Sequence, residues 1–123
     1  MQETIDDKGA GMSFSLETIN DILVVKVNDQ RATVEISGKL KEELITQIDD
    51  GNQNIVVDLS SSDFVDSSFL GALVAGLKKA TMKSGDLKIV GLQPPVRAMF
   101  ELTRLYRIFD IFDEQGDAVN SFN

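Results

Sequence analysis

The sequence predicts an α/β fold with a mixed, mainly parallel sheet and an N-terminal hairpin. Residues 55–59 and 87–92 are short, nearly continuous apolar runs rich in β-branched side chains, which suits interior strands covered on both faces. Residues with helical periodicity separate these runs, and two further extended runs precede them. Strands that alternate with helices favour parallel pairing through right-handed crossovers.

The hairpin is expected over residues 13–18 and 22–27, because the Asn20-Asp21 pair between them suits a tight turn. Residues 32–36 alternate weakly between apolar and polar side chains, which on periodicity alone predicts a third extended piece.

A helix follows, with an inward stripe made of Leu40, Leu44, Ile45 and Ile48. Thr33 or Ser37 is suited to cap its start, and Gly51 is suited to end it. Charged residues surround the stripe, so we expect an ordinary solvated outer face.

The second half of the chain repeats the pattern. A helix is expected from Ser67 onward, with an inward stripe of Leu70, Leu73, Leu77 and Ala80. After a turn at residues 83–86 and the strand over 87–92, Pro94 and Pro95 open another helix. Its expected inward residues are Val96, Met99, Phe100 and Thr103, and its outward ones are Arg97, Glu101 and Arg104. A short extended piece over 108–112 and a C-terminal helix from Asp113 complete the prediction.

Length and composition bound the function. The 123 residues suit one domain, which we place at residues 13–123, after a flexible acidic tail at residues 1–12. Met12 offers an alternative start of translation.

No signal peptide and no long apolar run is visible, so we expect a cytoplasmic protein. The 12 basic and 20 acidic residues give a charge of −8, which argues against direct binding to nucleic acid or to anionic membrane.

No enzyme motif emerges. The chain contains no cysteine and no histidine, which excludes thiolate chemistry, a Ser-His-Asp triad and the usual zinc sites. Ser67 and Lys78 lie roughly 16 Å apart along a helix, too far for a Ser-Lys dyad. Asp63 and Asp66 with the neighbouring hydroxyls offer too few ligands for Mg²⁺ or Ca²⁺. We therefore predict a protein that is not an enzyme and needs no metal or cofactor.

The most informative stretch is residues 63–71, where a buried strand turns into a helix. Asp66, Ser67 and Ser68 fall in the first turn, where a side-chain oxygen satisfies free amides and the helix dipole favours negative charge. Helix capping alone explains all three residues. A phosphate on Ser67 would lie over the same amides, so the local chemistry permits phosphorylation without requiring it.

The outer face of this helix carries no charge in its first two turns. Helical geometry places on it Ser67, Ser68, Gly71, Ala72, Ala75, Lys78, Lys79 and Met82. Small residues beside hydroxyls let a second protein approach the backbone closely, although the same residues also suit packing under the chain's own loops. If the face is a docking surface, a phosphate on Ser67 would bring about −1.5 to −2 charges into it.

The run Val56-Val57-Asp58-Leu59-Ser60, followed after four residues by Val65-Asp66-Ser67-Ser68-Phe69-Leu70-Gly71, resembles the signature of the STAS domain. In particular it is similar to the bacterial anti-sigma factor antagonists, and the likeness extends over residues 13–112. The family fold is a right-handed coil of strand-helix units with a mixed sheet. In this family the segment at residues 32–36 belongs to the approach to a helix instead of a full strand.

The resemblance implies a partner-switching protein. Ser67 would be phosphorylated by a cognate GHKL-type anti-sigma factor that is also a serine kinase, and a PP2C-type phosphatase would reverse the modification. Unphosphorylated protein would bind the kinase and free its sigma factor. The residues expected to contact the partner are Asp66, Ser68, Phe69, Gly71, Ala72 and Ala75, with Asp66 and Ser68 as the expected caps.

Two alternatives stay open at this point. The chain could be a STAS module in a circuit without a sigma factor, or a small-ligand or nucleotide-binding module that uses the turn at residues 63–68. The sequence also departs from the family pattern: Phe69 replaces a glycine, Arg104 and Tyr106 replace a late Gly and Asp, and Thr33 stands where relatives carry an acid.

Overall fold

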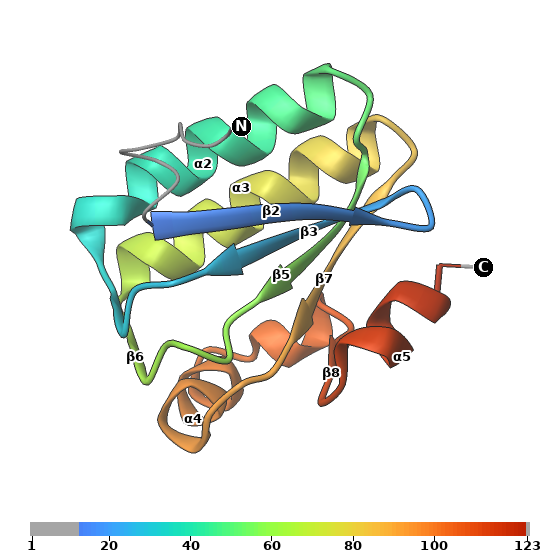
Figure 1. The fold of residues 1–123 in the computed structure, drawn as a ribbon. Coiled ribbons are helices and arrows are strands. Elements are labelled where there is room, and N and C mark those ends of the chain that lie inside the picture. Colours follow the sequence, from blue (N-terminus) through green and yellow to red (C-terminus); the bar gives the residue numbers. More distant parts are fainter. Residues whose placement is uncertain (1–12, 123) are drawn as a thin grey trace.

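A computed structural model describes residues 13–122, in which a mixed five-stranded sheet carries helices on both faces (Figure 1). The sheet order is β2-β3-β5-β7-β8, and a separate pair is formed by β4 and β6. Only β2 runs antiparallel to its neighbour. The strands are β2 (Phe14–Ile19), β3 (Ile22–Val27), β4 (Arg31–Ala32), β5 (Asn54–Asp58), β6 (Phe64–Val65), β7 (Asp86–Val90) and β8 (Ile111–Phe112).

The helices follow the strands in alternation, which confirms the predicted α/β class. They are α2 (Val34–Asp49), α3 (Ser67–Met82), α4 (Pro94–Leu102) and α5 (Gln115–Asn120), with a 3-10 turn η1 (Leu105–Arg107) between α4 and β8. In the part of the chain that the structure describes, no helix is long and apolar enough to cross a membrane. The tail predicted at residues 1–12 lies outside the described residues.

The N-terminal hairpin forms as expected. Phe14 pairs with Val27 and Ile19 with Ile22. The connecting residues Asn20 and Asp21 have φ angles of 52° and 68°, and two positive φ values in a two-residue loop match the twist of the strands it joins.

Alternation along the interior strands divides the apolar side chains between two cores. Val25 and Val57 point to the larger core beneath α2 and α3, whereas Val24 and Val56 point to a smaller core beneath α5. This two-sided burial explains why these strands read as continuous apolar runs.

Two close approaches fix how α3 lies on the sheet. A Cβ on Gly76 would lie 2.7 Å from Leu44 Cδ1, so this glycine lets α3 approach α2. A Cβ on Gly85 would lie 2.0 Å from the carbonyl oxygen of Gln53, so only glycine fits after α3.

Three sequence predictions need correction. Residues 32–36 do not form the strand that periodicity alone predicts: β4 ends at Ala32 and α2 begins at Val34, with Thr33 as its N-cap residue, which confirms the helix approach that the family resemblance implies. In α4, Val96 and Phe100 are buried as predicted, but Thr103 is exposed. The extended piece expected over residues 108–112 is reduced to the two residues of β8, because the amides of Ile108 and Phe109 donate back to the Leu105 carbonyl in η1.

Candidate functional site

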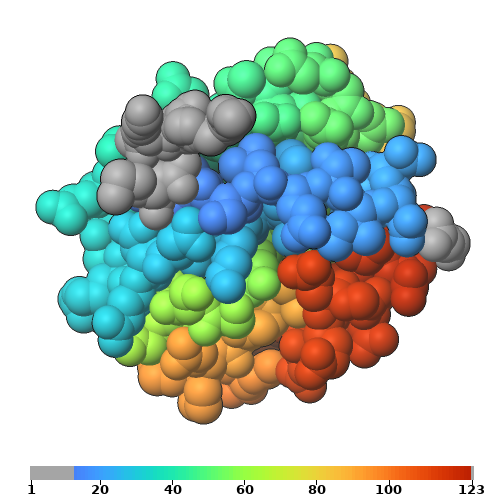
Figure 2. All heavy atoms as spheres, viewed as in Figure 1, coloured from blue at the N-terminus to red at the C-terminus, as the bar shows by residue number. Residues whose placement is uncertain are grey.

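The candidate site begins with two short parallel strands that each lead directly into a long helix. Strand β4 leads into α2 and strand β6 leads into α3, and Ala32 pairs with Val65. The Asp66 amide donates to the Ala32 carbonyl at 3.2 Å, and the Asp63 amide donates to the Gln30 carbonyl at 2.9 Å. The β4–β6 pair therefore sets the starts of α2 and α3 side by side. In the surface view, the yellow-green residues around β6 lie between the cyan segment that starts α2 and the orange segment of α4 (Figure 2).

A single carboxylate caps both helices. Asp66 is the N-cap residue of α3, and its Oδ1 accepts a hydrogen bond from the Phe69 amide at 2.9 Å. Its Oδ2 accepts a hydrogen bond from the Val34 amide, the first of α2, also at 2.9 Å. Thr33, the N-cap residue of α2, makes no side-chain cap of its own. The capping predicted for Asp66 is present, and it extends to a second helix.

Ser67 and Ser68 occupy the first two positions of α3, and both are exposed. Neither hydroxyl makes a hydrogen bond to any other residue between 13 and 122. The prediction that Ser68 caps the helix is therefore wrong, since Asp66 already binds the Phe69 amide. Both hydroxyls face solvent at the positive end of the helix dipole.

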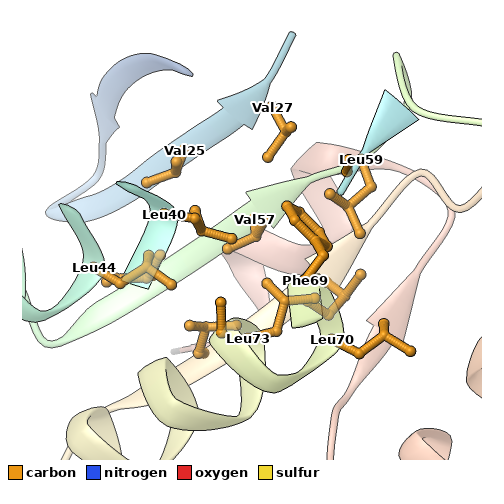
Figure 3. Packing of buried hydrophobic residues seen from close by; sticks show 14 of the residues in the cluster. Val25, Val27, Leu40, Leu44, Val57, Leu59, Phe69, Leu70 and Leu73 are labelled. Atoms are coloured by element: carbon orange, nitrogen blue, oxygen red, sulfur yellow. The ribbon is translucent and has the colours of Figure 1, made fainter. Parts of the chain in front are cut away.

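The predicted partner-binding residues divide into two groups. Gly71 is exposed, and a Cβ added to it would meet no other atom within 4 Å, while Ala75 is half-buried. Ala72 is 5% exposed and belongs to the main core, so its placement on the outer face is wrong. Phe69 is 0% exposed, and its ring points toward Val57 and Leu59 (Figure 3). Neither Phe69 nor Ala72 offers its side chain to a partner.

Charge differs between the two helix starts. The first turn of α2 contains Glu35, whereas the first turn of α3 contains no acid. Of the nearby carboxylates, Asp66 is held by two amides and Asp63 accepts a hydrogen bond from Gln30 Nε2 at 2.6 Å. The first turn of α3 therefore adds no acid of its own to the Asp66 carboxylate that caps the helix.

Sequence reasoning missed two apolar residues at this end. Val34 is 64% exposed and its amide binds Asp66, and Phe64 is 40% exposed two residues before Asp66. The Arg31 guanidinium lies 4.1 Å from the centre of the Phe64 ring. The signal was present in the sequence, because a strand of two residues buries one side chain, here Val65, and leaves its neighbour Phe64 outside.

The loop that precedes Ser67 is held from both sides. Ser62 is fully buried, and its hydroxyl donates to the Asp29 carbonyl at 2.7 Å. Gln93 Nε2, from the start of α4, donates to the Ser60 carbonyl at 2.8 Å. Hydrogen bonds from two other segments of the chain therefore hold the loop that leads to Ser67.

Two other features that can mark a functional site are a cluster of metal-ligating side chains and a cavity. Among residues 13–122, no group of three or more acidic side chains is placed to hold a metal ion. A cavity of about 440 Å³ exists, but residues of α4, η1 and β8 line it, and none of them belongs to the turn at residues 63–68. What the turn offers is an exposed hydroxyl beside small and apolar side chains.

Comparisons with known proteins agree with this geometry. The model of the STAS domain family matches residues 13–118. The chain belongs to the STAS family. BtrV of Bordetella bronchiseptica, whose name describes it as a candidate anti-sigma factor antagonist, is 30% identical to this STAS chain over 115 residues, which are 90% of this chain and 95% of BtrV.

Solved STAS structures share the fold. A candidate anti-sigma factor antagonist from Thermotoga maritima superposes with a TM-score of 0.80 at 24% identity, covering 93% of this chain and 97% of that one. SpoIIAA, an anti-sigma factor antagonist, superposes in its unphosphorylated form with a TM-score of 0.77 at 18% identity, covering 89% and 95%. The Bacillus protein SpoIIAA has also been solved in its phosphorylated form, with a TM-score of 0.71 at 17% identity, covering 89% and 99%. The relatives are thus regulatory proteins named for antagonism of anti-sigma factors.

Proposed function

We propose that this STAS protein is an anti-sigma factor antagonist controlled by phosphorylation of Ser67. Unphosphorylated protein binds a GHKL-type anti-sigma factor kinase and frees its sigma factor. The kinase transfers the γ-phosphoryl group of ATP to the Ser67 hydroxyl, which loses its proton, and a PP2C-type phosphatase hydrolyses the ester. The protein acts in the cytoplasm, catalyses no reaction itself and does not contact nucleic acid.

The observation that carries this proposal is that Asp66, and not Ser67, caps the start of α3. Asp66 supplies the cap through both carboxylate oxygens, which leaves the Ser67 hydroxyl exposed and without a structural task. Ser67 can therefore gain or lose a phosphate without loss of the hydrogen bonds that start the helix. Because the first turn of α3 contains no acid, its free amides also accommodate the added charge.

The partner surface that we propose combines two helix starts. From α3 it takes Ser67, Ser68 and Gly71, with the half-buried Ala75 at its edge. Val34 and Phe64 add exposed apolar area beside them. Asp66 is a positioning residue for this surface, because its carboxylate accepts hydrogen bonds from one backbone amide of each helix.

Phosphorylation would weaken docking more than folding. A partner that closes over an uncharged surface must desolvate the phosphate, and a buried charge without a partner is costly. Asp66 and Asp63 lie near Ser67 in sequence, whereas the nearest arginine in β6 and β4, Arg31, stacks on Phe64. A loss of about 3 kcal/mol would weaken binding by more than a hundredfold, which is enough for a switch.

The first test is phosphorylation of purified variants by a candidate GHKL-type anti-sigma kinase with ATP, followed by peptide mass spectrometry. We expect Ser67→Ala to abolish phosphoryl transfer. Ser68→Ala is the matched control, because Ser68 is the next residue, is also exposed and presents the same kind of hydroxyl. Unchanged phosphorylation of the Ser67→Ala protein would show that Ser67 is not the acceptor.

The second test is affinity capture of the kinase by wild-type, Ser67→Ala and Ser67→Asp proteins. Wild type and Ser67→Ala should retain the kinase, and Ser67→Asp should lose it. Equal retention by all three proteins would contradict the switch. Retention of a serine kinase that binds no sigma factor would support the same switch in another circuit.

A further inference from the structure

A second surface, formed by α4 and η1, differs from the rest of the molecule in charge. Residues 97–108 contain three of the four arginines of the chain, Arg97, Arg104 and Arg107, and a single acid, Glu101. The segment therefore carries a formal charge of +2 in a protein whose formal charge is −8. Arg97 is paired with Asp113 at 3.0 Å, so Arg104 and Arg107 are the two arginines of the segment that make no ion pair among residues 13–122. Arginine favours the planar, bidentate recognition of carboxylates.

The same segment exposes large apolar side chains beside a cavity. Leu102 is 78% exposed, Tyr106 53% and Ile108 50%. The cavity of about 440 Å³ is lined by Arg97, Phe100, Glu101, Tyr106 and Ile111. An apolar side chain from another molecule would find in it the exposed Tyr106 and the half-buried Ile111, above the fully buried Phe100.

The backbone at Arg104 supports a role for its side chain. Arg104 follows the C-cap of α4 with φ 62° and ψ 23°, the left-handed conformation that glycine adopts without strain. Among residues 13–122 the other non-glycine positive φ values belong to Asn20, Asp21 and Ser84, all with short polar side chains. An arginine in this conformation costs about 1 kcal/mol relative to glycine, so the fold alone does not favour it.

We propose that the α4–η1 surface is a second docking site, which binds an acidic protein segment through Arg104 and Arg107 and takes one of its apolar side chains into the cavity. The site is built from other elements than the Ser67 surface and does not depend on the proposed phosphorylation. Its concave shape suits a protein side chain better than a lipid surface, and the charge of −8 on the whole chain disfavours anionic membrane.

The test uses the full chain and a synthetic acidic amphipathic peptide of alternating Glu-Glu and Leu-Leu pairs, with a peptide of Lys-Lys and Leu-Leu pairs for comparison. Titration followed by amide resonances should show that the acidic peptide shifts residues 97–112 and that added salt weakens its binding. Binding elsewhere, or stronger binding of the basic peptide at residues 97–112, would overturn the proposal.

Arg104→Gly is the decisive variant, because it removes the charge while relieving the left-handed strain, so that the fold is retained. We expect binding of the acidic peptide to weaken about tenfold, the effect of one lost charge-assisted contact. Lys83→Gly, at an exposed position after α3, changes the net charge equally and should leave binding unchanged. Equal weakening by the two variants would reduce the effect to overall charge and overturn the proposal.

Tyr106→Ala tests the cavity separately. It should weaken binding of the acidic peptide, while the dependence of that binding on salt stays unchanged. Vesicles of phosphatidylcholine and phosphatidylserine test whether a lipid surface occupies the site instead. Binding of the vesicles at residues 97–112 without binding of the acidic peptide would identify a lipid surface as the occupant and contradict our proposal.

Discussion

Helices α2 and α3 are built on the same frame, yet only α3 presents two exposed serine hydroxyls at its start. Each spans 16 residues, follows a two-residue parallel strand and begins at the same carboxylate of Asp66. The first two positions are exposed in both helices and the third is buried in both. Even the fifth position is the same, Gly38 in α2 and Gly71 in α3, and both are exposed.

The difference lies in the side chains that this frame presents. The first turn of α2 exposes Val34 and Glu35, whereas the first turn of α3 exposes Ser67 and Ser68. Farther along, α2 turns charged residues outward, but α3 is packed more deeply and buries Ala72. Part of the missing charge on α3 thus reflects contact with its own core, and the neutral surface that remains is concentrated at the helix start.

The largest expected effect comes from the third position of each helix. Phe69→Ala should destabilise the protein by about 3–5 kcal/mol, because it empties a fully buried site, and Ile36→Ala by about 2–4 kcal/mol. Ser68→Ala, next to Phe69 but exposed, should change stability by less than about 0.5 kcal/mol. Urea unfolding measures all three. A small effect of Phe69→Ala would mean that its ring is available to a partner after all.

The shared cap gives the next largest effect. Asp66→Ala should cost about 2–4 kcal/mol, since it removes the side-chain cap of two helices at once. Asp66→Asn keeps one acceptor oxygen and should lose roughly half of this amount. Thr33→Ala is the control at the other N-cap, and should be nearly neutral because Thr33 makes no cap bond. Equal costs at Asp66 and Thr33, measured by thermal unfolding, would refute the shared cap.

Contact between the two helices is tested at Gly76. A methyl group there would lie 2.7 Å from Leu44 Cδ1 and 3.0 Å from Leu87 Cδ1, both in buried residues. Overpacking should outweigh the gain in helix propensity and leave Gly76→Ala less stable by about 1–2 kcal/mol. A stabilised variant in urea unfolding would show that α2 and α3 can move apart at no cost.

The smallest effect on stability is expected at the two matched glycines, Gly38 and Gly71. A binding measurement, in contrast, should distinguish the two variants. Gly71→Ala and Gly38→Ala should each stabilise the protein by about 0.5–1 kcal/mol, because both positions are helical and open. Only Gly71→Ala adds a methyl group to the surface proposed for the kinase, so only that variant should bind it more weakly in a titration. Equal affinities would remove α3 from the docking surface.

Local patterns in the sequence predicted the fold well where one rule acts alone. The Asn20-Asp21 turn, the strands β5 and β7 and the inward stripe of α3 follow from turn chemistry and from periodicity. The strand predicted over residues 32–36 failed because apolar alternation in so short a segment cannot be distinguished from the first turn of a helix.

The site was predicted less completely, because it depends on contacts between segments distant in sequence. The Asp66 cap on α3 is local and was expected, but its bond to the Val34 amide joins residues 32 positions apart. Ala72 was wrongly placed on the outer face, because helical geometry gives the direction of a side chain but does not show which other segment covers that side chain. Val34 and Phe64 join the site only through the β4–β6 pair, which no periodicity indicates.

The bond between Asp66 and the Val34 amide also makes α2 sensitive to events on α3. Negative charge on Ser67 acts directly on the carboxylate beside it, and that carboxylate is the acceptor for an amide in the other helix. The rate at which the Val34 amide exchanges its hydrogen with solvent should therefore report the state of Ser67, although Val34 itself is never modified. Through the Asp66 side chain, hydrogen exchange at the start of α2 would thus measure phosphorylation at the start of α3.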